Sequence, residues 1–103
     1  MDSNVQQALA ITLQNWQAMT SYQSDEKEAV ADQFQSSFYE FIDTVRDWVL
    51  RQDPLPLTLD DMLEIDMIQD IFDLLPAPLH LNFETEIELI IDRVERVDED
   101  KYD

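Results

Sequence analysis

Residues 54–78 read PLPLTLDDMLEIDMIQDIFDLLPAP, and this stretch decides how the chain can fold. It holds all four prolines of the protein, two at each end: Pro54, Pro56, Pro76 and Pro78. Because the residue before a proline is pushed out of helical geometry, helices should end at both borders. Between the borders there is no glycine and no Lys, Arg or His. We therefore expect helical structure here, set apart from the helices on either side.

The helical phase of the apolar residues inverts inside this stretch. At 100° per residue, Leu59 and Met62 lie on one side of a helix, but after Ile65 the apolar residues occupy the side that was acidic. Two interpretations stay open: a break near Ile65, with Asp66 and Gln69 forming a new capping box, or one helix buried on both sides. We favour the break, because three aspartates would otherwise face inward without partners.

Capping signals predict where the helices begin. Besides the pair at the possible break, four expected helix starts carry a Ser, Thr or Asp that is followed three residues later by Gln, Glu or Asp, which is typical of a helix N-terminus. These pairs are Ser3–Gln6, Asp25–Glu28, Thr58–Asp61 and Thr85–Glu88. The predicted helices cover residues 3–22, 25–51, 59–75 with the break, and 85–97. Residues 79–83 are expected to form an extended connector whose leucines and Phe83 dock onto the bundle.

Apolar residues repeat at helical spacing along the three longer segments. The repeats are Val5, Leu9, Thr12, Trp16 and Met19; Val30, Phe34, Phe38, Phe41, Val45 and Trp48; Ile87, Ile90, Ile91, Val94 and Val97. The last set is rich in β-branched residues, so a strand is an alternative there, although its spacing favours a helix. We expect an all-α fold, a compact antiparallel bundle of four to five helices without a sheet. One domain should span residues 1–103, with 1–2 and 98–103 frayed.

The composition excludes several classes of function. With 24 acidic and six basic residues the net charge is −18, which disfavours direct contact with nucleic acid or with anionic membranes. No apolar run reaches transmembrane length and the N-terminus does not resemble a secretory signal, so a cytoplasmic location is expected. The absence of glycine and cysteine argues against phosphate-binding loops, nucleophile elbows and thiolate sites.

No catalytic, cofactor or metal site is predicted. The only histidine, His80, is interpreted as a surface or loop-packing residue, because a general base needs a nucleophile and an orienting carboxylate beside it, and the sequence does not show either one there. Carboxylates do recur at helical spacing, but inward-facing Glu-x-x-His pairs and flexible oxygen-rich loops are missing. A weak response to divalent cations is therefore only a minor alternative. The rows are Asp66, Asp70 and Asp73; Glu40, Asp43 and Asp47; Glu88, Asp92 and Glu95.

The candidate functional site is an acidic interaction surface. Between Gln52 and Asp92 the sequence has 11 acids and no Lys or Arg, whereas ordinary surfaces mix both signs. The candidate residues are Asp60, Asp61, Glu64, Asp66, Asp70 and Asp73. They predict a non-enzymatic protein–protein interaction module whose partner has a basic or apolar surface. Two alternatives stay open: the acids imitate nucleic-acid phosphates and inhibit a DNA- or RNA-binding protein, or they only keep the protein soluble.

Three apolar residues are hard to place in the predicted core. Met67, Leu74 and Leu89 lie off the stripes, and their exposure would create an apolar patch with an acidic rim. Such patches are typical of subunit or partner interfaces, so we also expect homodimerisation.

Overall fold

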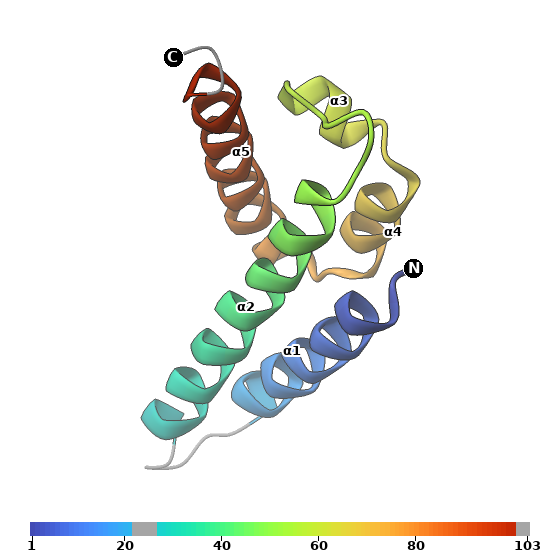
Figure 1. The fold of residues 1–103 in the computed structure, drawn as a ribbon. Coiled ribbons are helices and arrows are strands. Elements are labelled where there is room, and N and C mark those ends of the chain that lie inside the picture. The colour runs from blue at the N-terminus through green and yellow to red at the C-terminus, as the bar shows by residue number, and fades with distance from the viewer. Residues whose placement is uncertain (22–26, 101–103) are drawn as a thin grey trace. The chain divides into compact units, whose positions relative to one another are not determined.

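The computed structural model describes the backbone of residues 1–21 and 27–100, and the side chains of residues 1–21 and 28–93. Within these ranges the regular structure consists of five helices without a strand, which confirms the all-α fold class (Figure 1). The helices are α1 (Ser3–Ser21), α2 (Lys27–Leu50), α3 (Leu59–Leu63), α4 (Asp66–Leu74) and α5 (Ala77–Asp100). The chain divides into two compact units, Met1–Trp48 and Val49–Asp103, which are described one at a time.

Asp2 caps the first helix of the first unit. Its carboxylate accepts hydrogen bonds from the backbone N–H groups of Asn4 (3.1 Å) and Val5 (3.2 Å). Its carbonyl oxygen accepts a third from the N–H of Gln6 at 2.9 Å. A carboxylate suits this position because it satisfies free N–H groups and its charge complements the helix dipole. The predicted capping box of Ser3 and Gln6 is therefore wrong by one residue, since Ser3 is already helical.

Helices α1 and α2 pack against each other in opposite directions. The Oγ1 atom of Thr12 lies 3.1 Å from the carbonyl oxygen of Ser37, and the rings of Trp16 and Phe34 are 5.3 Å apart. The later residue of α1, Trp16, therefore lies beside the earlier residue of α2, Phe34. The two helices are antiparallel. The residues buried in this unit come mainly from the two predicted stripes: Val5, Leu9, Thr12, Ser37, Phe38, Phe41, Ile42 and Val45.

The boundaries of α1 and α2 agree closely with the sequence-based expectation. Helix α1 ends at Ser21, and α2 ends at Leu50, one residue before the predicted end. The predicted cap at Asp25 and the predicted end of the first helix at Tyr22 lie outside the described residues. Helix α2 is followed by a turn that contains a cis peptide bond between Asp53 and Pro54.

The predicted break near Ile65 is confirmed. Helix α3 is capped by Thr58, whose hydroxyl accepts from the N–H of Asp61 at 3.1 Å, and it ends at Leu63. Ile65 then adopts an extended conformation, with φ −71° and ψ 125°, and α4 begins at Asp66. Helix α4 can therefore turn its apolar side toward the core independently of α3.

The capping box predicted for this break is wrong. Ile65, not Asp66, is the N-cap of α4, and its side chain makes no capping hydrogen bond. The side chain of Gln69 instead reaches back across the break, where its Nε2 donates to the carbonyl oxygen of Leu63 at 2.8 Å. This bond satisfies one of the carbonyls that the end of α3 leaves without an intrahelical donor.

Helix α5 begins eight residues earlier than the sequence predicted. Residues 79–83, expected to be extended, are helical, and the helix starts at Ala77. Pro78 is compatible with this start, because backbone N–H groups in the first turn have no intrahelical acceptor to lose. Thr85 is consequently no cap: its Oγ1 donates to the carbonyl oxygen of Leu81 at 3.0 Å, within the helix. The helix continues to Asp100, through the first residues of the tail expected to fray.

The helical conformation of residues 79–83 decides which of them are buried. Leu79 and Phe83, four residues apart on one helical face, are 2% and 0% exposed, whereas Leu81 is 71% exposed. Docking was therefore predicted correctly for two of the three residues. The ring of Phe72 in α4 contacts the ring of Phe83 at 5.0 Å, edge to face, and joins α4 to α5.

The core of the second unit draws on every helix in it. Its buried hydrophobic residues are Val49, Met62, Met67, Ile68, Ile71, Leu75, Leu79, Phe83, Ile87, Ile90 and Ile91. Ile87, Ile90 and Ile91 confirm the predicted stripe of the last helix as far as side chains are described.

Candidate interaction surface

The six carboxylates singled out from the sequence are all exposed. Asp60, Asp61 and Glu64 belong to α3 and its C-terminus, and Asp66, Asp70 and Asp73 belong to α4. We call these six residues the acidic surface. On α4 the opposite side carries the buried residues Met67, Ile68 and Ile71, so the three aspartates form a row along the outer side. Binding by these residues stays a prediction.

One member of the acidic surface also has a structural role. The carboxylate of Asp61 accepts a hydrogen bond from the backbone N–H of Leu57 at 3.3 Å, while the N–H of Asp61 donates to Thr58. Together these two bonds fix the start of α3. Substituting Asp61 would disturb the helix start as well as the charge, so the α4 row is the better place to test binding.

The acidic surface lies in a part of the chain without its own counter-charges. No Lys or Arg occurs between Gln52 and Asp92. By contrast, Asp43 on α2 pairs with Arg46 at 3.1 Å, one turn away on the same helix. Like charges at helical spacing repel by a few tenths of a kcal/mol per pair, and no Lys or Arg within this stretch offsets that repulsion.

Exposed leucines accompany the acids in the second unit. Leu63 is 36% exposed and Leu74 is 56% exposed, at the ends of α3 and α4 respectively. On α5, Leu81 and Leu89 are also exposed. Met67, which was expected to join Leu74 and Leu89 in an apolar patch, is buried at 6% exposure because α4 turns it toward the core. The prediction that Met67 belongs to an exposed apolar patch is therefore wrong.

His80 lies in the first turns of α5 rather than in a connector. Its Nε2 is 2.9 Å from the carbonyl oxygen of Leu75, and its ring meets Phe72 edge to face at 5.7 Å. A carbonyl oxygen can only accept, so Nε2 carries the proton in this bond. The imidazole thus helps to hold the junction between α4 and α5, and the loop placement predicted for it is wrong.

The three carboxylate rows belong to three different helices, α2, α4 and α5. Among the residues that the structure describes, no group of three or more His, Cys, Asp or Glu side chains is arranged to hold a metal ion. The rows follow separate helix faces, and the side chain of Glu95 lies outside the described set.

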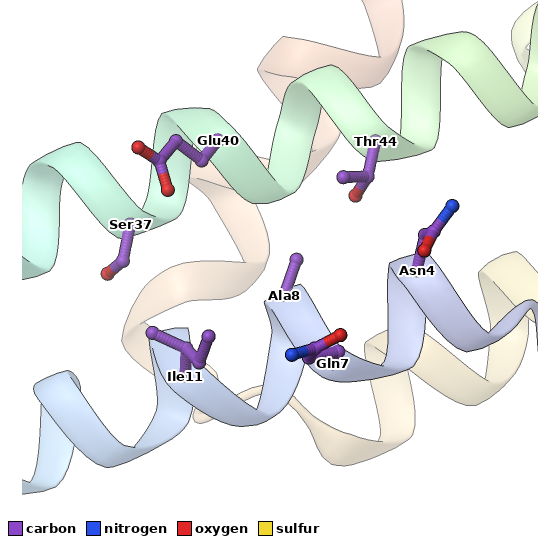
Figure 2. Close-up of a pocket in the computed structure, with 7 residues that line it drawn as sticks. All are labelled: Asn4, Gln7, Ala8, Ile11, Ser37, Glu40 and Thr44. Atoms are coloured by element: carbon purple, nitrogen blue, oxygen red, sulfur yellow. The ribbon is translucent and has the colours of Figure 1, made fainter.

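A surface groove lies between α1 and α2, and no pattern in the sequence predicted it. It has a volume of about 280 Å³ and lies within the first unit (Figure 2). Figure 2 shows Ala8 pointing from α1 toward α2, while Ser37 and Thr44 point from α2 toward α1. The seven lining residues are Asn4, Gln7, Ala8, Ile11, Ser37, Glu40 and Thr44. The groove arises from the register of two helices, which spacing within one helix does not reveal.

Comparisons of this chain with protein-family models, curated proteins and solved structures found no match. The case for its function therefore rests on the geometry and charge described above. None of the helices in the described ranges combines the length and apolarity that a bilayer span requires.

Proposed function

We propose that this protein is a non-enzymatic interaction module that binds a basic protein partner through the acidic surface of α3 and α4. The observation that carries the proposal is the exposure of all six carboxylates within a stretch that has no Lys or Arg. A partner that supplies Lys and Arg side chains would relieve the repulsion among these carboxylates. It would also be steered toward them by the net charge of −18.

The exposed leucines give the proposed partner a second chemical feature. Leu63 and Leu74 lie on the same two helices as the acids and offer apolar contact area. Interfaces commonly combine an apolar centre with a polar rim. The partner surface that fits best therefore carries apolar side chains flanked by lysines or arginines.

The test removes the α4 row without changing side-chain size. A triple variant, Asp66→Asn, Asp70→Asn and Asp73→Asn, is compared with the wild type in affinity capture from the cells that produce the protein. Captures at about 50 and about 300 mM NaCl separate electrostatic from apolar binding, because added salt screens exposed charges. We expect the triple variant to lose the partners that the wild type releases at high salt, with an unchanged helical circular dichroism spectrum.

A control variant removes the same number of negative charges, but from α2 instead of α4. The variant Glu28→Gln, Asp32→Asn and Asp43→Asn removes three exposed acids from α2 and, with Asp43, the ion pair to Arg46, so its helical circular dichroism spectrum is compared with that of the wild type as well. Equal loss of partners in both triple variants would show that only total charge matters, and it would contradict a site on α3 and α4.

The spacing of the α4 row supports a second candidate, a nucleic-acid mimic. Asp66 and Asp70 are four residues apart, which corresponds to about 6 Å along a helix, and Asp73 extends the line. A regular line of exposed negative charge can occupy the site where a basic protein normally holds phosphates. Under this hypothesis the captured partners bind DNA or RNA, and duplex DNA displaces the protein from them. Captured partners that retain the protein in the presence of excess nucleic acid would contradict it.

Homodimerisation stays a prediction with its own test. The exposed leucines favour association, whereas a net charge of −18 on each copy opposes it. We expect a dimer mass in light scattering at high protein concentration and raised salt. A monomer mass at every accessible concentration would contradict this expectation.

A further inference from the structure

We propose that the groove between α1 and α2 binds the side chain of a lysine that a protein partner inserts into it. This site lies in the first unit and shares no residue with the acidic surface. The inference therefore stands apart from the proposed function, and either can fail alone.

The hydroxyl groups of the groove offer hydrogen-bond acceptors. Ser37 Oγ donates its proton to the carbonyl oxygen of Phe34 at 2.8 Å, and Thr44 Oγ1 donates to that of Phe41 at 2.6 Å. A hydroxyl has one proton and two lone pairs. With each proton engaged inside α2, only the lone pairs of the two oxygens are left for a ligand. Thr44 is half-buried and Ser37 is 7% exposed, and both side chains point toward α1 along the groove (Figure 2).

The remaining polar groups also suit a positively charged donor. Glu40 contributes an exposed carboxylate, and the amides of Asn4 and Gln7 can turn their oxygen atoms toward a donor. No Lys, Arg or His lines the groove. A lysine ammonium carries three N–H donors and no acceptor, so it complements a site rich in acceptors with one negative charge.

The apolar part of the groove fits the stem of the same side chain. Ile11 is 45% exposed, and Ala8 is half-buried beside it on α1. Lysine covers apolar surface with its four methylene groups while its charged end stays near polar groups. A second copy of this chain is a poor source of that lysine, because it has only two, Lys27 and Lys101, among 24 acidic residues.

A blocked amino acid gives the most direct test. The full chain, labelled with ¹⁵N, is titrated with Nα-acetyl-lysine methylamide and followed by the backbone amide signals. Nα-acetyl-norleucine methylamide has an apolar side chain of similar length without the charge, and it is titrated in parallel. We expect lysine-dependent shifts that saturate and centre on the amides of Ala8, Ile11 and Ser37. Equal shifts with the norleucine compound, or shifts spread over all acidic helices, would overturn the proposal.

Two pairs of variants connect the signal to the groove. Glu40→Gln should weaken binding about fivefold, the upper range for an exposed ion pair, whereas Asp32→Asn, on α2 outside the groove, should not. Ala8→Met should fill the groove and abolish binding, whereas Ala10→Met, at an exposed position of α1, should leave it intact. Retained binding in Ala8→Met, with the helical spectrum unchanged, would overturn the proposal.

Discussion

At the scale of single residues, Thr12 shows how a polar group can belong to a core. It is 0% exposed, and its Oγ1 lies 2.9 Å from the carbonyl oxygen of Ala8 in its own helix and 3.1 Å from that of Ser37 in α2. The hydroxyl proton is shared between the two carbonyl oxygens, so the buried hydroxyl has hydrogen-bond partners. The bond to Ser37 also connects the two helices. The apolar stripe of α1 thus contains one polar contact with α2.

Replacing this hydroxyl by a methyl group should weaken the first unit. Thr12→Val keeps the shape but removes the bond to Ser37, and we expect a loss of about 0.5–1.5 kcal/mol in the free energy of unfolding. Urea denaturation measures the loss as a lower midpoint at constant slope. Thr85→Val is the control, because Thr85 is exposed and bonds only within α5. Equal losses in both variants would mean that the contact between helices contributes nothing.

At the scale of helices, the conformation of residues 79–83 at the start of α5 determines which of them are buried. In an extended segment Leu79, Leu81 and Phe83 would all face one side, whereas in a helix Leu81 faces away from the other two. The structure buries Leu79 and Phe83 and leaves Leu81 exposed.

This difference gives a prediction with a built-in control. Phe83→Ala should destabilise the protein by about 3–5 kcal/mol, the usual range for a buried phenylalanine. Leu81→Ala, two residues away, should change stability by less than about 0.5 kcal/mol. Thermal or chemical unfolding of the two variants measures both values. A large loss in Leu81→Ala would support the extended connector instead.

The sequence predicted most helices correctly because their signals are local. Apolar spacing of three and four residues located α1, α2 and the break at Ile65. Pro76 and Pro78 misled the prediction for α5, because a proline ends a helix that precedes it but can equally lie in the first turn of one that follows. Two capping side chains were also misassigned. At Ser3 the neighbouring Asp2, a residue of similar chemistry, takes the capping role. At Asp66 the N-cap position falls one residue earlier, on Ile65, which has no polar side chain to cap with.

At the scale of the whole molecule, charge should limit stability. A net charge of −18 on 103 residues repels itself in the folded state, and salt screens that repulsion. Raising NaCl from about 10 to about 100 mM shortens the Debye length from about 30 to about 10 Å. We expect the melting temperature to rise over this range. The rise should be smaller in the variant Asp66→Asn, Asp70→Asn, Asp73→Asn, and a flat or falling response in the wild type would contradict the prediction.

The candidate sites differ in how far the sequence could predict them. Exposure of the acidic surface follows from side-chain chemistry, because unpaired carboxylates are rarely buried, so the six residues could be named in advance. The groove depends on which turn of α1 meets which turn of α2. That register is set by Thr12, Trp16 and their contacts on α2, and the periodicity of either helix alone does not contain it.

The lack of basic residues between Gln52 and Asp92 has a practical consequence for chemical labelling. The two lysines of the chain, Lys27 and Lys101, both lie outside this stretch, so reagents that acylate amines cannot modify the acidic surface itself. Trypsin has no cleavage site there either, and α3 and α4 remain on one peptide after complete digestion. The protein can therefore be immobilised or fluorescently tagged through its amines while every carboxylate proposed to meet a partner keeps its native chemistry.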